Sequence, residues 1–156
     1  MWGRLEDDMM KIEAAQNALS SYLDNLDASN QVALRAYGHN REKDCQDSEL
    51  LVPFNNVSDV KDQIRNRALA IKPTGRTPIG ISLMKALEDI GDQEAEIILI
   101  SDGLETCDID PCALMKSWRD KDINIKVHVV GLGLTEKEKN TLMCIADVSG
   151  GQFKDA

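Results

Sequence analysis

The sequence has no long hydrophobic run, no excess of basic residues, no low-complexity tract and no internal repeat. A transmembrane helix needs about 18 or more consecutive apolar residues, so we expect no membrane span in this chain. The 18 Lys and Arg are outnumbered by 27 Asp and Glu, which gives a net charge of -9. Nucleic-acid surfaces require a clustered basic patch, so this balance argues against DNA or RNA as a partner.

Motifs of the common enzyme classes are also missing. There is no Gly-x-Ser-x-Gly elbow, no Gly-Lys-Ser/Thr phosphate-binding loop and no clear Cys-His pairing. The two histidines, His39 and His128, stand at separated strand positions, and no paired short-spaced ligand motif accompanies them. We therefore expect a protein that is not an enzyme and has no zinc site.

Residues 1–8 contain neither the basic segment nor the apolar stretch of a secretory signal. The sequence nevertheless has four cysteines, an even number, which permits two disulfides. They are Cys45, Cys107, Cys112 and Cys144. Disulfides persist in oxidising compartments, whereas cytosolic proteins keep their thiols reduced. From the cysteine count alone, a disulfide-bonded exported protein and a reduced cytosolic one remain open.

Hydrophobic spacing alternates along the chain between the helical and the strand period. The pattern predicts helices over 5–26, 57–68, 79–90, around 112–118 and around 142–146, and strands over 31–37, 49–54, 96–101, 123–131 and 151–154. Such alternation specifies a doubly wound α/β fold in three layers, with a mostly parallel sheet and one antiparallel edge strand. We expect residues 1–156 to form one domain.

Two polar segments are candidates for a binding site in such a fold. Residues 97–100 are four consecutive aliphatics, typical of a central parallel strand covered by helices on both faces. Ligands bind at the carboxyl ends of such strands, and the loop there begins with Ser101 and Asp102. Asp102 can hold a hard cation or simply cap a turn. Earlier in the chain, Thr77 offers a hydroxyl and Pro78 opens a helix, which by itself is an N-cap.

Thr77-Pro78 opening a helix and an aliphatic strand ending in Ser-Asp-Gly, about 25 residues later, together resemble the von Willebrand factor type A (VWA) family. The resemblance implies a Rossmann-like domain and places Thr77 and Asp102 in a metal-ion-dependent adhesion site. That site usually holds Mg²⁺, and an acidic group from the partner completes its octahedron. The implied function is a protein-binding module for acidic ligands; the alternative is a metal-independent structural or assembly scaffold.

The resemblance extends along essentially the whole chain, including residues 35–39, 129–133 and 149–153. More narrowly, Cys45 with residues 105–107 and 110–112 is similar to bacterial VWA proteins known as calcium-activated chloride channel homologues. That name describes kinship and does not imply a channel. The kinship and the cysteines together favour a periplasmic or other extracytoplasmic location.

One departure from the family concerns its first motif, Asp-x-Ser-x-Ser, which ends the first, central strand. This sequence starts at the methionine that would follow the motif, so that strand and three metal ligands are missing. We expect N-terminal truncation, with a naturally short metal-free domain as the other explanation, and weak or absent Mg²⁺ binding by this chain. The strands at 31–37 and 96–101 would each lose a ladder partner. We predict that they pair directly, or that a second copy fills the gap as a homodimer.

The cysteine positions leave two pairings open. Cys107 and Cys112 flank four residues of the loop that follows Asp102, so a local disulfide there would stiffen the rim of the metal site. Cys45 lies in the loop after the 31–37 strand, at the same end of the sheet, and could instead pair with Cys107. We interpret Cys144, beside an apolar helix residue, as a buried thiol.

Overall fold

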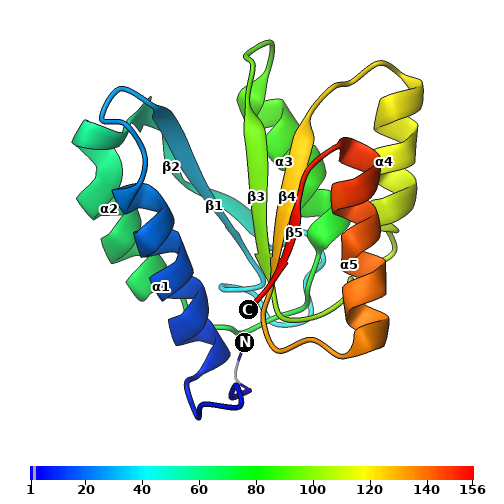
Figure 1. The fold of residues 1–156 in the computed structure, drawn as a ribbon, viewed down its shortest axis with the longest axis horizontal. Helices are drawn as coiled ribbons and strands as arrows, with labels where there is room; N and C mark the ends of the chain where they lie inside the picture. The colour runs from blue at the N-terminus through cyan, green and yellow to red at the C-terminus, as the bar shows by residue number, and fades with distance from the viewer. Residues whose placement is uncertain (2) are drawn as a thin grey trace.

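The computed structural model describes Met1 and residues 3–156, which form five helices and five strands around two small sheets (Figure 1). In chain order the elements are α1 (Lys11–Asp24), β1 (Gln31–Tyr37), β2 (Ser48–Asn56), α2 (Val57–Leu69), α3 (Ile79–Ile90), β3 (Glu96–Ser101), α4 (Pro111–Asp120), β4 (Lys126–Gly131), α5 (Glu136–Ser149) and β5 (Phe153–Asp155). The predicted α/β class, with parallel strands and one antiparallel strand, is confirmed. Within the described residues, no helix combines the length and the apolar character needed to cross a membrane.

The first half of the molecule is an antiparallel hairpin of β1 and β2, packed against α2, which in turn packs against α1. Its core cluster is formed by Leu23, Val52, Val60 and Ile64. Helix α1 begins at Lys11, so the predicted start at residue 5 is wrong. The preceding residues turn back on themselves, because Asp8 adopts a positive φ of 69° and the Met9 N–H donates to the Asp7 carboxylate.

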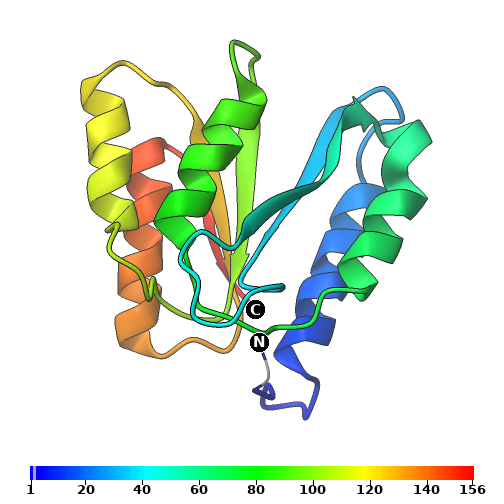
Figure 2. The same cartoon turned by 180° about the vertical axis from the view of Figure 1, so that it is seen from behind.

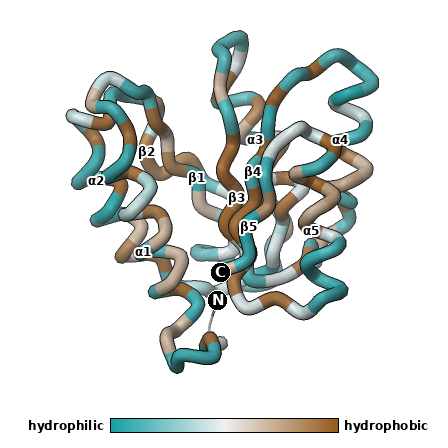
Figure 3. Tube along the Cα trace, viewed as in Figure 1, coloured by the Kyte–Doolittle hydropathy of each residue, from teal (hydrophilic) through white to brown (hydrophobic). Residues whose placement is uncertain are grey.

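The second half is a parallel sheet in the order β3-β4-β5. One face carries Leu99, Val127 and Val129, which share a core cluster with residues of α3, α4 and α5. Side chains alternate between the faces of a strand, so Ile98 and Ile100 point the other way; they are partly buried and belong to neither core cluster. Strand β3 is thus apolar on both faces, as its hydropathy colouring shows (Figure 3), but only one of these faces belongs to a core cluster.

Strands β1 and β3 do not pair within the described part of the chain, so the prediction of a direct ladder between them is wrong. The two sheets approach each other at the carboxyl ends of these strands, where the Tyr37 hydroxyl donates to the Ile100 carbonyl at 3.0 Å. From there the strands diverge (Figures 1 and 2), and a ladder requires a constant spacing of about 4.8 Å. Each strand therefore keeps one edge without a ladder partner among residues 1 and 3–156, and β3 stands at the edge of its sheet.

Helix α3 connects the two halves, since it contacts β1 and β2 as well as α4 and contributes to the second core cluster. It lies on the far side in Figure 1 and on the near side in Figure 2. An ion pair fixes it to the hairpin: Arg35 donates from Nε and Nη2 to Asp89 at 2.7 and 2.9 Å. Because α3 is held in this position, its first turn lies beside the loops that follow β1 and β3.

Candidate functional site

Three loops meet at the carboxyl ends of β1 and β3. They are residues 38–47, 70–78 and 102–110, and we call their joint surface the loop face. The first two are joined through Gly38, whose carbonyl accepts the N–H groups of Thr74 and Gly75 at 2.9 Å each. Gly38 has a φ of +60°, and a Cβ added to it would overlap the carbonyl oxygen of Arg76. The close approach of the two loops therefore requires glycine at this position.

The loop at 38–47 is organised around a buried carboxylate. Asp47 is 1% exposed, and its Oδ2 accepts the backbone N–H groups of Asn40 and Arg41 at 2.9 Å each. Its own backbone carbonyl accepts the Gly38 N–H. The polar loop between β1 and β2 is thus an ordered turn, stabilised by hydrogen bonds from its N–H groups to the buried Asp47.

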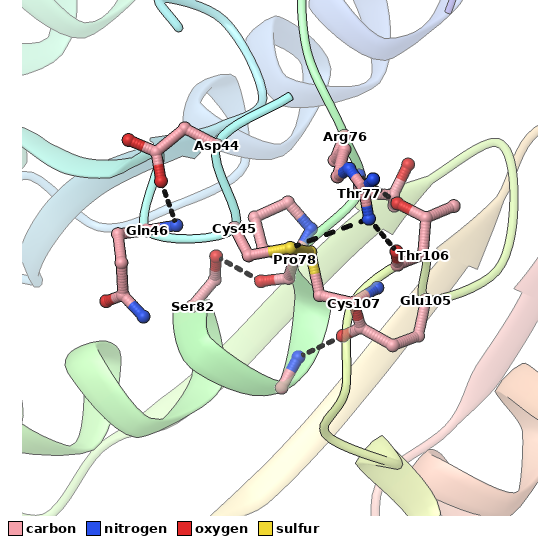
Figure 4. The surroundings of a disulfide bond; sticks show 11 residues. Asp44, Cys45, Gln46, Arg76, Thr77, Pro78, Ser82, Glu105, Thr106 and Cys107 are labelled. Atoms are coloured by element: carbon pink, nitrogen blue, oxygen red, sulfur yellow. Dashed lines mark hydrogen bonds between the residues drawn. A yellow bond between two sulfur atoms is a disulfide. The ribbon is translucent and has the colours of Figure 1, made fainter. Parts of the chain in front are cut away.

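A disulfide joins this loop to the one that follows β3. Cys45 is bonded to Cys107, with 5.8 Å between their Cα atoms (Figure 4), which is the alternative pairing of the sequence analysis. The local Cys107–Cys112 pairing is wrong, and so is the interpretation of Cys144 as a thiol, because Cys112 is bonded to Cys144. Asp110 caps α4 and Pro111 opens it, so the chain turns into the helix at Cys112 and carries that sulfur toward α5.

Thr77 lies at the junction of the second and third loops. Its N–H donates to Thr106 Oγ1 at 2.7 Å, and its carbonyl accepts the Thr106 N–H at 3.2 Å. The side chain is half-buried, and its hydroxyl has no hydrogen-bond partner among residues 1 and 3–156. Arg76 extends over the same loop and donates from Nη1 to the Thr106 carbonyl at 3.1 Å (Figure 4). These contacts fix Thr77 beside the loop that carries Asp102.

Glu105 has a structural role that the sequence did not reveal. Its Oε2 accepts the Gly80 N–H at 2.7 Å, in the first turn of α3, and its Oε1 accepts the Cys107 N–H at 2.6 Å. Asp110 plays a similar part at α4, where its Oδ1 accepts from Cys112 and Ala113. Both carboxylates therefore hold helix starts by hydrogen bonding to N–H groups that the helix leaves unsatisfied.

Asp102 stands at the carboxyl end of β3, as predicted, with its side chain 18% exposed. Its Oδ2 accepts the amino group of Met1 in an ion pair. Asp102 directly follows the last residue of β3, and its charge acts on the hydroxyl of Tyr37, the last residue of β1.

Tyr37 is a partly buried neighbour of the loop face. Burial raises the pKa of the Tyr37 hydroxyl to about 12, although a hydrogen bond with Ser101 acts to lower it; the negative charges of Asp102 and Glu105 raise it further. The hydroxyl is thus neutral over the physiological range. It can serve as the hydrogen-bond donor that joins the two sheets.

The residues do not by themselves fit a complete metal site. Among the residues that the structure describes, no group of three or more His, Cys, Asp and Glu side chains could hold a metal ion. Of the ligands implied by the family resemblance, this chain supplies the Thr77 hydroxyl and the Asp102 carboxylate. Mg²⁺ demands six oxygen ligands in nearly ideal octahedral geometry, so two side chains leave most of the shell to other groups.

In sequence, the chain is similar to two Bacillus subtilis (strain 168) proteins described as uncharacterized, YwmC and YwmD. It is 28% identical to YwmC over 158 residues, which cover 94% of this chain and 68% of YwmC. It is 25% identical to YwmD over 157 residues, which cover 94% of this chain and 69% of YwmD. No protein-family model matches the chain.

In structure, the chain resembles proximal thread matrix protein 1 (PTMP1) from the mussel byssus, with a TM-score of 0.67 and 17% identity over 94% of this chain. It spans 36% of the PTMP1 chain. A second PTMP1 structure, with a zinc-occupied MIDAS motif, gives a TM-score of 0.64 at 17% identity, over 92% of this chain and 36% of that one. The SpRpn10 VWA domain gives 0.67 at 14% identity, over 94% of this chain and 76% of that domain. The chain therefore has a VWA-like fold.

Proposed function

We propose that this chain is a protein-binding module of the VWA type and that it binds through the loop face. The observation that carries the proposal is the arrangement of Thr77 and Asp102 on neighbouring loops, which the hydrogen bonds between Thr77 and Thr106 hold together beside the carboxyl end of β3. Ligands of open α/β sheets bind at this edge. Loops that are already ordered lose less entropy on binding, which favours a binding surface.

The partner that we propose is a protein with an acidic group, bound with the help of a divalent cation, Mg²⁺ in the first instance. PTMP1, whose fold is similar, has a MIDAS motif that zinc can occupy. We propose that a segment preceding Met1 in a longer protein supplies the ligands that this chain lacks. The unpaired edges of β1 and β3 support this, because a segment ending beside Asp102 would lie between them. This chain alone would hold Mg²⁺ weakly or not at all.

Other parts of the proposal follow from composition and cross-links. Two disulfides are typical of proteins that mature in an oxidising compartment, so we propose an extracytoplasmic location. The net charge of -9 disfavours nucleic acid as a partner. We propose no catalytic role. We also propose that a second copy of the chain can occupy the gap between β1 and β3 when no upstream segment occupies it.

The test is a calorimetric titration of Mg²⁺ into this chain and into a version extended upstream. We expect binding by the extended version, weak or no binding by the present chain, and loss of binding in an extended Asp102→Asn variant. An extended Asp108→Asn variant is the matched control, because Asp108 is an exposed carboxylate on the same loop. If both versions show the same negligible binding, the metal-dependent proposal is wrong.

The second candidate function is a metal-independent assembly scaffold. It is favoured by the lack of a three-ligand group among the described residues. A scaffold would keep its partner when a chelator is added, whereas a metal-assisted module would release it.

A further inference from the structure

We propose that the Cys45–Cys107 disulfide is a reducible latch on the loop face, which a dithiol reductant opens while Cys112–Cys144 stays closed. A regulatory role for this latch rests on the proposed function, because the latch holds the loop face through which we propose that the chain binds its partner. The chemical difference between the two disulfides stands independently of that function and can be measured without a partner.

The two disulfides join different kinds of segment. Cys45–Cys107 links two surface loops that belong to separate sheets, and its sequence separation is 62 residues. Cys112–Cys144 links α4 to α5, helices that already pack through buried residues such as Met115 and Ile145. Opening the first bond therefore releases one loop from another. Opening the second leaves two helices held by their core.

A positive charge lies at one end of the latch. Arg76 Nη1 is 4.0 Å from Cys45 Sγ, and the same nitrogen donates to the Thr106 carbonyl at 3.1 Å, which keeps the guanidinium in place (Figure 4). A nearby cation stabilises a thiolate, and a more stable thiolate departs faster from a disulfide under attack. At the other disulfide, the Cys112 N–H bonds to the Asp110 carboxylate, a negative charge close to that cysteine. The surroundings therefore favour Cys45 as the leaving sulfur.

The reaction requires one equivalent of a dithiol. Its thiolate attacks Cys107 Sγ and forms a mixed disulfide, while the electron pair of the original bond departs with Cys45 Sγ as a thiolate beside Arg76. The second thiolate of the reductant then attacks the reductant's other sulfur, which is bonded to Cys107 Sγ in the mixed disulfide. This closes the cyclic disulfide and releases the Cys107 thiolate. The reductant is oxidised to a cyclic disulfide by two electrons, and the protein thiolates take up protons from water according to the pH.

Opening the latch loosens the loop face without unfolding the domain. The loop at 38–47 keeps its hydrogen bonds to Asp47 and Gly38, and Thr77 keeps its bonds to Thr106. What is lost is the covalent link between the loops that follow β1 and β3. A ligand that needs both loops in one arrangement then has to order them on binding, which weakens its affinity.

The test is a graded reduction of the folded chain with dithiothreitol, followed by alkylation with iodoacetamide and mass spectrometry of the four cysteines. We expect Cys45 and Cys107 to be alkylated first. Arg76→Ala should slow this step by about threefold, as loss of a charge beside the leaving sulfur predicts, and Arg76→Lys should preserve the rate. Arg119→Ala removes an exposed arginine on α4 and is the matched control, with no change expected.

Reduction of both disulfides together, or of Cys112–Cys144 first, would overturn the proposal, as would equal rates for Arg76→Ala and the parent chain. Amide hydrogen exchange of the reduced protein gives a second readout: faster exchange in 38–47 and 102–107, with α4 and α5 unchanged. Failure of the Mg²⁺ titration would leave these results intact, so the latch and the metal-dependent function can fail separately.

Discussion

Among single residues, Arg35 and Asp89 carry the electrostatic link between the hairpin and α3. Their side chains are 15% and 18% exposed, and Arg35 also donates from Nη1 to Ser48 Oγ at 3.2 Å. Each of these largely buried charges is hydrogen-bonded to its partner. Removal of one side chain would leave the other charge without a partner and with little access to water. The pair is therefore sensitive to substitution on either side.

We predict that Asp89→Asn lowers the free energy of unfolding by about 2 kcal/mol, because it leaves the Arg35 guanidinium without its counter-charge. Urea denaturation measures the change. Asp120→Asn is the control, since the Arg119–Asp120 pair is 61% and 68% exposed and should contribute less than about 0.5 kcal/mol. Equal effects of the two substitutions would contradict this role for Asp89.

Asp47 makes the loop face sensitive to acid. Burial acts to raise the pKa of its carboxyl, but the N–H groups of Arg41 and Asn40 and the charges on His39 and Arg41 outweigh it, so the pKa lies below its ordinary value of 3.8. A lowered folded-state pKa stabilises the fold above the ordinary pKa, and this stabilisation is lost as the pH falls through the lowered value.

We predict that Asp47→Asn is less stable than the parent chain by about 1.5 kcal/mol at neutral pH and that the difference shrinks as the pH falls below the ordinary Asp value. Urea denaturation over a pH series measures it, with the exposed Asp108→Asn as control. A difference that stays constant from neutral to acid pH would show that the charge of Asp47 is not responsible.

How far the sequence predicts the site depends on the kind of contact. Asp102 follows an aliphatic strand and Thr77 precedes an apolar helical pattern, so local patterns predict where they lie in the fold, whereas only the resemblance to the VWA family assigns them to a metal site. The role of Glu105 depends on a hydrogen bond to Gly80, 25 residues earlier, which no local pattern encodes. The cysteine pairing likewise depends on where α4 begins, because the cap at Asp110 separates Cys107 from Cys112.

At the scale of elements, hydrophobic periodicity predicts the type of an element, helix or strand, more accurately than its first and last residues. Strand β1 was predicted with its observed bounds, and α3 likewise. Helix α1 was predicted to begin too early, because Leu5 and Met9 fit the helical spacing while Asp7 and Asp8 form a turn between them. The side chain of Asp7 competes with the helix for a backbone N–H, and hydrophobic spacing does not register that competition.

Close packing of a loop on β4 gives a prediction for an element. A Cβ added to Gly151 would overlap the carbonyl oxygen of Val127 and lie 3.1 Å from the His128 nitrogen, so β4 would have to shift. We predict that Gly151→Ala lowers the free energy of unfolding by about 2 kcal/mol. Gly103→Ala is the matched control, with nothing within 4 Å of its added Cβ and an expected change within about 0.5 kcal/mol. Similar thermal denaturation of both variants would count against the packing argument.

At the scale of the whole molecule, the main feature is the separation of two sheets: β1 pairs only with β2 and β3 only with β4, so their facing edges have no ladder partner among the described residues. The sequence predicted the elements on either side but not their divergence, because a strand's apolar pattern does not say which strand lies beside it. The partly buried Ile98 and Ile100 lie on β3, and Met1 lies beside Asp102 at the end of that strand. We proposed above that an upstream segment lies between these two edges.

Amide hydrogen exchange of this chain and of its upstream-extended version tests that account most directly. In this chain, the amides of β1 and β3 that do not bond to β2 or β4 should exchange rapidly, because unpaired edges open without breaking a ladder. In the extended chain, a strand seated between them should slow the same amides by at least about a hundredfold. Identical exchange of β1 and β3 in the two chains would contradict the account.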